Sequence, residues 1–397
     1  MKLRPKGRGA QTTIRLAIIG CGAIVRAQHV PAICSTGAFE LAAVADRSAE
    51  NAADTVAMWL GIEPDREGAT HRLKPEVRDF MASSHWASHT DMLASAECDA
   101  VLIATPNNTH ERIAADCLDA GMHVFCEKPV AFTVEGHRRL EDLARGHDLV
   151  FQVGLVFRYS PVFRHVGGLL ENEGLGPPLM MLINEFRPFA FQPWRYSKAV
   201  SGGMFIEKNC HHFDLFNWML GDSVRPRYVT AMGGQSVLKE APKEVWCLRE
   251  KKVLPASDVI DHAWVLVEYE NGVRAQLGIS YFCPWGREFR VSLMGEEWKI
   301  DVHEMDRLIY VHRGPEMKEQ RFPPDPSGKA WQEEAGFKEE GAVHSGAVKQ
   351  WEDFAFCVRT GEAPFCDLRK ASESIRLAVA ADRALLEGRI VEVEFEE

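Results

Sequence analysis

The chain has 397 residues, of which 46% are hydrophobic and 26% are charged, and its formal net charge at pH 7 is −11. This length predicts two domains, and the balance of residue types is that of an ordinary globular protein. The acidic excess and the lack of a basic stripe argue against nucleic acid as a partner and against binding to an anionic membrane surface.

The N-terminus and the cysteines indicate the compartment. Basic residues precede an apolar stretch, which resembles a secretory signal, but Gly20 and Gly22 interrupt that stretch. We therefore expect residues 1–13 to form a flexible tail. No apolar run reaches the roughly 18 residues of a membrane span. The 10 cysteines are scattered without a Cys-x-x-Cys pair, which is typical of a reducing compartment and predicts a cytoplasmic location.

Residues 14–153 alternate short apolar runs with helical patterns. The strand-like runs are residues 15–19, 41–45, 100–104, 123–126 and 149–153, and the helical runs are residues 27–34, 49–60, 110–120 and 134–145. Such alternation predicts a doubly wound parallel sheet covered on both faces. Residues 61–88 break the rhythm with Gly, Pro and charges, so we expect a surface insertion there.

A glycine-spaced turn follows the first apolar run. Gly20 and Gly22 stand between a strand pattern and a helix pattern, and the next apolar run ends at Asp46. A βαβ unit binds a dinucleotide with this combination of a Gly-x-Gly turn and an acid at the next strand end. We expect the turn, including Ala23 and Ile24, to contact the cofactor, and we assign residues 14–153 to an NAD(P)-binding Rossmann domain. A plain βα turn without a dinucleotide is the alternative.

Asp46 bears on the choice of cofactor. Its carboxylate is suited to accept hydrogen bonds from a ribose 2′-OH, whereas a 2′-phosphate would meet like charge. At about 4 Å and an effective dielectric near 20, two unit charges repel by about 4 kcal/mol. The sequence therefore favours NAD, while Arg47 could offset the repulsion and leaves NADP possible. Asp46 could also cap the following helix.

Residues 154–397 carry a different pattern. Longer alternating runs occur at residues 180–187, 263–269, 273–280 and 289–294, and Asn271-Gly272 between two of them is a strong hairpin signal. This half is expected to form an open, mainly antiparallel sheet that binds substrate and pairs subunits into a homodimer or homotetramer. We expect a surface excursion over residues 310–345 and closing helices within residues 345–386.

Three further segments complete a family pattern. They are residues 104–110, residues 126–129 (Cys-Glu-Lys-Pro) and residues 202–214. With the glycine turn, they resemble the Gfo/Idh/MocA oxidoreductases, the family of glucose–fructose oxidoreductase and inositol dehydrogenase. The resemblance implies a two-domain NAD(P)-dependent dehydrogenase acting on CH–OH groups, with the nucleotide on the first domain and the substrate against the sheet of the second.

The resemblance also implies residue roles. Lys128 takes the place of the family's substrate-facing lysine, and Glu207 and His211 correspond to its Asp-x-x-x-His element, with Glu in place of Asp. Glu127 is expected to touch the nicotinamide ribose. The other residues expected at this end of the cofactor are Thr105, Pro106, Asn107 and His110, the last of which could instead cap its helix.

The chemistry follows from the residue types. Oxidising a secondary alcohol removes a proton from oxygen while hydride leaves carbon. His211 is the natural base, because an imidazole pKa of about 6.5 lies near operating pH. Glu207 lies four positions earlier, so on a helix its carboxylate would fix the imidazole tautomer. Lys128 would hydrogen-bond the reacting oxygen and stabilise developing negative charge.

Substrate contacts are expected beyond this centre. Arg158 and Tyr159 open the second domain, where the family often carries an arginine near the substrate. Trp194 and Arg195 place an aromatic ring beside a guanidinium, which suits a sugar face and its hydroxyls. Asp214 either hydrogen-bonds the substrate or stabilises its helix. The predicted function is hydride transfer between NAD(P) and a secondary alcohol of a sugar, polyol or cyclitol.

Three alternatives stay open. The enzyme could oxidise a glycoside transiently, eliminate a group and return the hydride, with Lys208 and His212 as extra acid–base groups. A metal could bind at His211, His212 and Asp214, although adjacent helical residues point about 100° apart and cannot easily bind one ion, so we expect no metal. A nucleotide-binding sensor without turnover is the third, and the Lys128–His211 pair argues against it.

Overall fold

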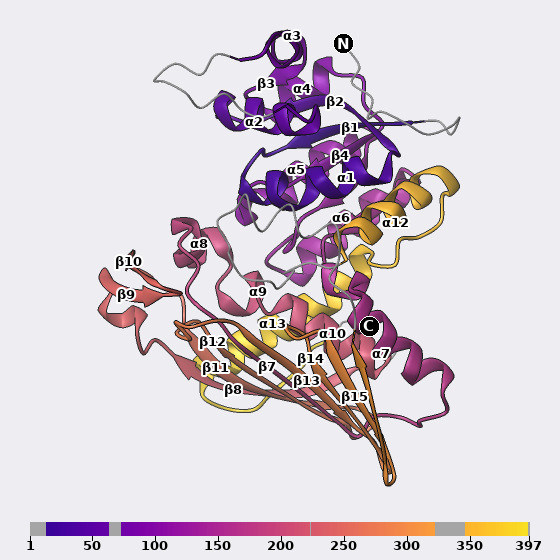
Figure 1. Ribbon diagram of the computed structural model, residues 1–397, viewed down its shortest axis with the longest axis vertical. Coiled ribbons are helices and arrows are strands. Elements are labelled where there is room, and N and C mark those ends of the chain that lie inside the picture. The colour runs from indigo at the N-terminus through magenta and orange to yellow at the C-terminus, as the bar shows by residue number, and fades with distance from the viewer. Residues whose placement is uncertain (1–12, 63–72, 223, 322–345, 396–397) are drawn as a thin grey trace.

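The computed structural model describes residues 13–62, 73–222, 224–321 and 346–395. Two sheets form separate layers with helices between them, the first sheet in the upper half of Figure 1 and the second in the lower half. Apart from Thr13, the tail expected over residues 1–13 lies outside the described residues. No helix in the described part of the chain is both long enough and apolar enough to span a bilayer.

The first sheet is the predicted parallel sheet, in the order β3-β2-β1-β4-β5-β6. Its strands are β1 (Ile14–Ile19), β2 (Phe39–Ala45), β3 (His85–Trp86), β4 (Ala100–Ile103), β5 (His123–Cys126) and β6 (Phe151–Val153). Nearly every side chain of these strands is buried, as expected for a sheet covered on both faces. The order reverses between β1 and β4, which creates a crevice beyond the carboxyl ends of these strands.

The helices of this half confirm the predicted alternation. They are η1 (Val25–His29), α1 (Val30–Thr36), α2 (Ala49–Trp59), α3 (Pro75–Ser84), α4 (His89–Ser95), η2 (Asn107–Thr109), α5 (His110–Asp119) and α6 (Val134–Gly146). The surface insertion expected over residues 61–88 was wrong in part. α3 buries Val77 and Phe80, and β3 joins the edge of the sheet, while residues 63–72 lie outside the described residues.

The second sheet has the order β16-β15-β14-β13-β7-β12-β11-β8-β17. β7 and β12 run parallel and the other neighbours run antiparallel, which confirms the predicted fold class. Its strands are β7 (Met180–Phe186), β8 (Pro226–Gly234), β11 (His262–Tyr269), β12 (Arg274–Ser280), β13 (Glu288–Met294), β14 (Trp298–His303), β15 (Leu308–Arg313), β16 (Glu316–Arg321) and β17 (Val391–Glu392). A separate hairpin contains β9 (Lys243–Cys247) and β10 (Glu250–Leu254).

Two local expectations in this sheet have different outcomes. The predicted hairpin joins β11 to β12, and Gly272 in its turn has φ +87°. The surface excursion expected from residue 310 was wrong as far as residue 321, because β15 and β16 pair there at the edge of the sheet. Residues 322–345 lie outside the described residues.

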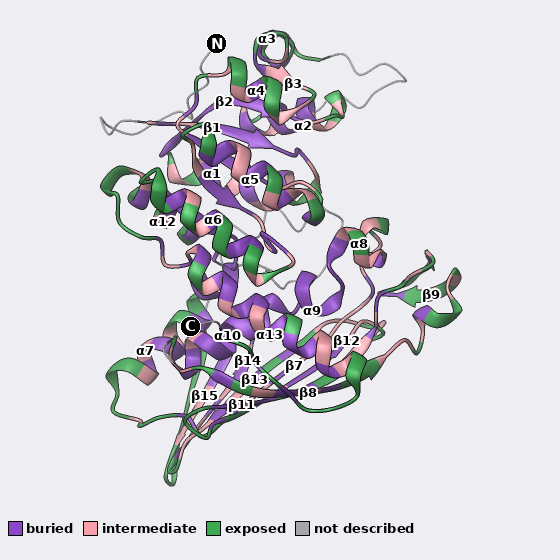
Figure 2. Ribbon diagram, turned by 180° about the vertical axis from the view of Figure 1, so that it is seen from behind, coloured by how far each residue is buried: buried purple, intermediate pink, exposed green. Residues whose placement is uncertain are grey.

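Helices cover one face of the second sheet. They include α10 (Cys210–Leu220) and α13 (Leu368–Glu387), which Figure 2 shows largely buried between the sheet and the upper half. The remaining elements are η3 (Val156–Tyr159), α7 (Pro161–Asn172), η4 (Pro193–Tyr196), α8 (Lys198–Ser201), α9 (Met204–Glu207), η5 (Leu238–Glu240) and α12 (Ala347–Thr360). Alternate side chains, such as Met232, Trp264 and Leu266, are exposed on the sheet's opposite face.

The helix α12 returns to the first sheet after the second sheet is complete. Figure 1 shows it beside α1 and α6 in the upper half. Its Trp351 stacks on Phe125 of β5, with ring centroids 4.3 Å apart, and its Phe354 lies over Phe39 of β2. The boundary at residue 153 stays a prediction, but the core beneath β1 and β2 draws on a helix more than 300 positions along the chain.

Candidate active site

The turn after β1 is shaped by two glycines with different constraints. Gly20 has φ +88°, and a Cβ there would lie 2.6 Å from the Ala104 carbonyl oxygen and 2.9 Å from Thr105 Cγ2. The turns after β1 and β4 thus touch where the strand order reverses. At Gly22 an added Cβ would meet nothing within 4 Å. The open backbone at this helix start fits a bound pyrophosphate.

The start of the first helix carries Val25 where the usual pattern has a third small residue. Val25 is fully buried and begins a π-helical turn, whereas the preceding Ala23 and Ile24 are exposed. Arg26 Nη1 donates to the Cys21 carbonyl oxygen at 2.6 Å and so stabilises the turn from below. A π turn widens the helix, which accommodates the valine and leaves the exposed backbone in place.

Asp46 ties the end of β2 to the glycine turn. Its Oδ2 accepts from the Cys21 backbone N–H at 2.7 Å, and its Oδ1 accepts from the Ser48 backbone N–H at 2.7 Å. The residue that caps α2 is Ser48, whose hydroxyl accepts from Asn51 N, so the direct capping role considered for Asp46 was wrong. A carboxylate oxygen has two lone pairs, so Asp46 can still accept from a ribose hydroxyl. Arg47 is exposed next to it.

Asn107 and His110, which follow β4, form hydrogen bonds with other segments of the chain. Asn107 Nδ2 donates to the Ser201 carbonyl oxygen at 3.0 Å, which joins the first half to α8. His110 is buried between the carbonyl oxygens of Pro129 and Thr105, at 2.8 and 2.7 Å. These contacts favour positioning roles for both residues, and their direct contact with the cofactor stays a prediction. Pro106 is exposed, and Thr105 lies against the glycine turn.

Glu127 is held by a buried histidine. His29 Nε2 lies 2.9 Å from Glu127 Oε1, and the indole N–H of Trp351 donates to His29 Nδ1 at 3.1 Å. Burial raises the pKa of Glu127, but the hydrogen bond from His29 and the charge of Lys128 outweigh it and lower the pKa. Glu127 is therefore an ionised acceptor beside Lys128.

Lys128 joins the two halves of the molecule. Its Nζ donates to the Glu207 carbonyl oxygen at 2.7 Å and lies 3.3 Å from Glu207 Oε1. Arg195 Nη2 lies 3.5 Å from the same carboxylate oxygen. Burial raises the pKa of Glu207, but the charges of Arg195 and Lys128 lower it to about 2. The carboxylate is thus ionised and held between two cations. The peptide bond between Lys128 and Pro129 is cis.

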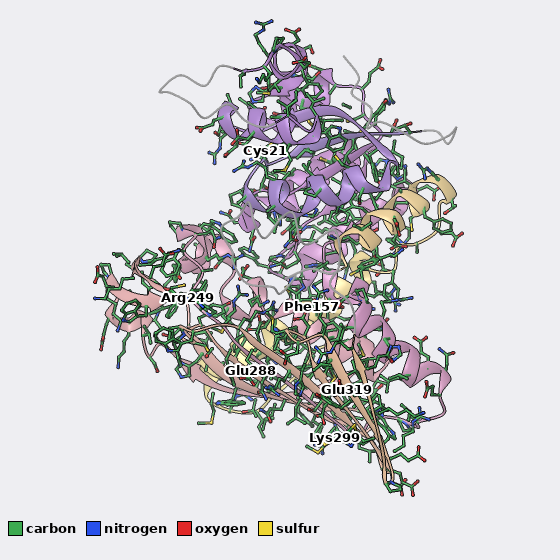
Figure 3. All side chains as sticks on the ribbon, in the orientation of Figure 1. Cys21, Phe157, Arg249, Glu288, Lys299 and Glu319 are labelled. Atoms are coloured by element: carbon green, nitrogen blue, oxygen red, sulfur yellow. The ribbon has the colours of Figure 1, made fainter. Side chains whose placement is uncertain are left out.

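His211 is the second residue of α10 and is buried. The helix is interrupted between Glu207, the last residue of α9, and Cys210, the first residue of α10. The expectation that the Glu207 carboxylate fixes the His211 imidazole stays a prediction. The His211 ring packs on Phe157, with centroids 4.7 Å apart. Figure 3 labels Phe157 between the two halves.

Three residues expected to contact the substrate, Arg158, Tyr159 and Asp214, are buried. Arg158 is fully buried, and its Nε donates to both oxygens of Asp214 at 2.9 Å. Its two terminal nitrogens donate to Asp222 at 3.1 and 2.8 Å. The Tyr159 hydroxyl donates to Asp353 Oδ2 of α12 at 2.6 Å. These contacts favour a structural role for Arg158, Tyr159 and Asp214, and substrate binding by them stays a prediction.

The residues considered for a metal diverge. Asp214 pairs with Arg158, whereas His212 Nε2 lies 2.8 Å from Glu185 Oε2 on the other side of α10. Asn209 Nδ2 donates to His212 Nδ1 at 3.0 Å, so both nitrogens of that ring have partners. Among the described residues, no group of three or more His, Cys, Asp or Glu side chains is arranged to hold an ion. The metal alternative was therefore wrong for this trio.

A buried charge cluster centred on Glu185 was missed from the sequence. Arg287 Nε donates to Glu185 Oε1 at 2.7 Å, Lys208 Nζ lies 3.1 Å from Glu185 Oε2, and Arg187 Nη1 lies 3.7 Å from Oε1. Glu185 follows Met181 and Ile183 on the buried face of β7. That alternation was a usable signal, because an acid in an otherwise apolar period-2 pattern has to find cations.

A pocket opens beside Glu207. It encloses about 400 Å³ of space free of protein atoms, counting the part open to solvent. Among the residues that line it are Arg187, Arg195, Glu207 and Tyr281. Trp194 is not one of them, although Arg195 lies over its ring at 5.2 Å. Glu207 both lines the pocket and contacts Lys128, so it connects the two.

Two family models match the chain. Residues 14–155 match the model described as oxidoreductase family, NAD-binding Rossmann fold, and residues 168–393 match the model described as oxidoreductase family, C-terminal alpha/beta domain. Both carry the name GFO_IDH_MocA, and together they span most of the chain.

Individual proteins resemble the chain more distantly. It is 28% identical to inositol 2-dehydrogenase 2 of Saccharopolyspora erythraea over 307 residues, which are 77% of either chain. It is 26% identical over 210 residues to the uncharacterized oxidoreductase YrbE of Bacillus subtilis, a match that spans 53% of this chain and 56% of that relative. The crystal structure of GenD2 from gentamicin A biosynthesis in complex with NAD shares the fold, with a TM-score of 0.73, 23% identity, and coverage of 99% of this chain and 100% of that chain.

Proposed function

The chain belongs to the Gfo/Idh/MocA oxidoreductase family, and on that premise we propose that it oxidises a secondary alcohol of a sugar, polyol or cyclitol with NAD. The observation that carries the proposal is the contact of Lys128 with Glu207, at 2.7 and 3.3 Å. It brings a cation from the cofactor half to the acid that precedes His211. A carbinol at this position would meet a donor for its oxygen and a base for its proton.

The residues that would hold NAD lie along the crevice after β1. The open backbone from Gly22 to Ile24 would bind the pyrophosphate, and Asp46 would accept from the adenosine ribose. Glu127, kept ionised beside Lys128, would accept from the nicotinamide ribose. When bound, NAD supplies a hydride acceptor for the carbinol carbon.

The chain's own residues would handle the proton and the charge. His211 takes the carbinol proton on an imidazole nitrogen as the C–H bond gives up its hydride, which leaves a C=O group. Lys128 donates to the reacting oxygen and stabilises its negative charge before the proton has fully left. Glu207 keeps Lys128 in place through the contacts of its carbonyl and carboxylate oxygens with the lysine Nζ.

The substrate class has separate support. One relative is named inositol 2-dehydrogenase 2, which favours a ring or chain with several hydroxyl groups. The pocket beside Glu207 offers Arg195 and Tyr281 as polar partners for such hydroxyls. The lining also includes Met204, Leu238 and Val259, so a few polar groups stand among apolar walls, as is typical of pockets that orient a small ligand.

The test is a screen of polyols, cyclitols and sugars with NAD and with NADP, followed by absorbance of the reduced cofactor. We expect at least one polyol to reduce NAD, and the Lys128→Met variant to bind NAD without turnover. Binding of NAD with no reduction by any polyol or sugar in the panel would count against the proposal. Faster reduction of NADP than of NAD would contradict the role given to Asp46.

A second candidate function rests on Lys208. This lysine is buried, lies over the Phe157 ring at 5.4 Å, and has its pKa lowered by burial to about 7, against the opposing effect of Glu185. Such a group can exchange a proton near neutral pH, as a transient oxidation and elimination on a glycoside would require. A glycoside labelled with deuterium at the carbinol carbon distinguishes the two functions. Retention of the label in product with no free NADH would favour elimination.

Assembly and location belong to the same proposal. We propose a homodimer or homotetramer that pairs through the exposed face of the second sheet. Trp264 and Met232, which are paired across β11 and β8, are 49% and 77% exposed. Large exposed apolar patches mark interaction sites. Light scattering of the wild type and of Trp264→Lys would show whether this face forms a subunit interface. The 10 free thiols support a cytoplasmic location.

A further inference from the structure

The walls of the pocket beside Glu207 carry more positive than negative charge. Arg187 and Arg195 both line it, and Glu207 is its one acidic lining residue among those described. Glu207 is not available to neutralise both arginines, because Lys128 Nζ lies 3.3 Å from the same oxygen that Arg195 approaches at 3.5 Å. The lining of the pocket therefore carries positive charge that no protein carboxylate fully neutralises.

The charge cluster around Glu185 also contains more basic than acidic side chains. Glu185 is approached by three basic side chains, Arg187, Arg287 and Lys208. Burial raises the pKa of Glu304, and the nearby charge of Arg287 opposes that rise. His212 adds no positive charge at neutral pH, since burial lowers its pKa to about 4. Glu185 and Glu207 are thus approached by the basic side chains of Lys128, Arg187, Arg195, Arg287 and Lys208. Of these, Lys208 is only partly charged near neutral pH, because burial lowers its pKa to about 7.

Several guanidinium nitrogens in this region have no protein partner. Within the described residues, Arg287 Nη1, Arg287 Nη2 and Arg195 Nε are buried and make no hydrogen bond. Only 8% of the Arg287 side chain is exposed. Arg287 is paired with Glu185 through Nε, but each buried N–H without an acceptor is costly, so these unpaired donors point to an acceptor that completes the site.

We propose that the substrate is a sugar acid or polyol carboxylate, whose carboxylate binds between Arg187 and Arg195 while its carbinol lies at Lys128. The inference rests on the proposed function and narrows its substrate class. Arginine suits this task because its planar group binds a carboxylate through two parallel hydrogen bonds.

The geometry also limits the length of the acid. Lys128 and Arg195 contact one oxygen atom of Glu207, so the carbinol and the carboxylate of a substrate that spans them lie only a few bonds apart. A carboxylate is favoured over a phosphate monoester, because Glu207 also lines the pocket and would repel a dianion more strongly than a monoanion. Sugar phosphates are therefore a second arm of the test.

The test measures binding of matched probes to the NAD-loaded full-length protein by titration calorimetry. The probes are D-gluconate, D-galactonate and D-glucuronate, their neutral counterparts D-glucitol, D-galactitol and D-glucose, and glucose 6-phosphate. We expect at least one acid to bind roughly 10- to 100-fold more tightly than its neutral counterpart, the range of one or two charge-assisted hydrogen bonds.

Three variants link that preference to the arginines. Arg195→Gln should reduce the preference for acids roughly 10-fold or more, and Arg195→Lys should restore part of it. Arg195 lies in a short surface helix with 29% of its side chain exposed, so the substitution is compatible with folding. Arg187→Gln tests the other side of the pocket. Arg274→Gln, an exposed arginine on β12 paired with Glu268, is the matched control and should behave as the wild type.

The outcomes separate this inference from the proposed function. The inference is overturned if no acid binds, if neutral polyols bind as tightly as acids, or if the phosphate binds most tightly. It is also overturned if Arg195→Gln leaves the preference unchanged. In each case, reduction of NAD by a neutral polyol would leave the proposed function standing, whereas a protein that does not bind NAD would refute the proposed function itself.

Discussion

Trp351 donates its indole N–H to His29 Nδ1 at 3.1 Å, although 322 positions separate the two residues in the chain. The bond settles which nitrogen of the buried imidazole carries the proton. Since Nδ1 accepts, Nε2 carries the hydrogen and donates to Glu127 Oε1 at 2.9 Å. A helix near the C-terminus thereby orients an acid in the loop that holds Lys128.

Replacing Trp351 by Phe tests this relay. The phenyl ring would keep the stacking on Phe125, at 4.3 Å, but would remove the N–H. We expect the dissociation constant for NAD to rise about 5-fold, since one hydrogen bond contributes about 1 kcal/mol. Fluorescence titration with NAD measures the effect. Trp218→Phe is the matched control, because Trp218 packs on Phe365 away from Glu127, and an equal loss of affinity in both variants would refute the relay.

The two glycines after β1 should respond oppositely to alanine. Gly20→Ala forces a side chain into a positive φ and against the Ala104 carbonyl oxygen at 2.6 Å, so we expect a loss of stability of several kcal/mol. Gly22→Ala meets nothing within 4 Å, so the protein should fold normally. Its methyl group would occupy space reserved for the pyrophosphate and should weaken NAD binding about 10-fold or more. Thermal unfolding and NAD titration of both variants check the contrast, which fails if the Gly22 variant binds NAD normally.

Lys128→Met should abolish most of the turnover while sparing the cofactor. We expect kcat to fall about 1000-fold, the upper effect of removing one donor to a developing oxyanion, and NAD affinity to change little. Lys349→Met, an exposed lysine on α12, is the control. Steady-state kinetics with the best polyol of the screen provides the measurement. A variant with wild-type kcat would remove Lys128 from the chemistry.

Glu207 should make stability depend on pH in acid. Its pKa falls from an ordinary value of 4.5 to about 2 in the folded protein, so it stabilises fully above pH 4.5 and progressively less as the pH falls toward 2. Between pH 5 and pH 3, the wild type should lose about 2 kcal/mol more unfolding free energy than Glu207→Gln, which cannot titrate. Urea unfolding at both pH values measures this difference. Glu250 forms an exposed ion pair with Lys252 and serves as the control. Glu250→Gln should show no such difference from the wild type.

Arg158 should prove structural. Arg158→Met would leave Asp214 buried without its cation, which costs about 3–5 kcal/mol of unfolding free energy. Arg158→Met combined with Asp214→Asn should recover part of that loss, because no buried charge is then left alone. Denaturant unfolding measures both variants. If Arg158→Met is as stable as the wild type but has a greatly raised KM, then Arg158 binds substrate after all.

Much of the fold could be predicted from the sequence, because the strands of the first sheet are largely apolar and several of the second, such as β7, β11 and β13, alternate. The hairpin between β11 and β12 carries its own turn signal in Asn271-Gly272. β16 could not be predicted, because its six residues, Glu316–Arg321, are all exposed and include no apolar alternation. β16 is a strand because its backbone hydrogen-bonds to β15. The local sequence of β16 contains no information about that partner.

The candidate site was harder to predict than the fold. Lys128 and Glu207 could be placed together through a family resemblance, and the structure joins them. Arg158 and Arg187 look equivalent in the sequence, yet one is enclosed by Asp214 and Asp222 and the other lines a pocket. The difference depends on which face of each element meets the core, and for a charged residue in an irregular segment the sequence does not determine this.

The return of α12 to the first sheet limits how this protein can be divided. A fragment that stops at residue 153 would lack Trp351 and Phe354, and the faces of Phe39 and Phe125 that they cover would be left in water. Chimeras that graft the N-terminal half onto another catalytic partner would therefore need the C-terminal helix as well. The nucleotide half is contiguous in space but not in the gene, so recombination at a single point cannot transplant it.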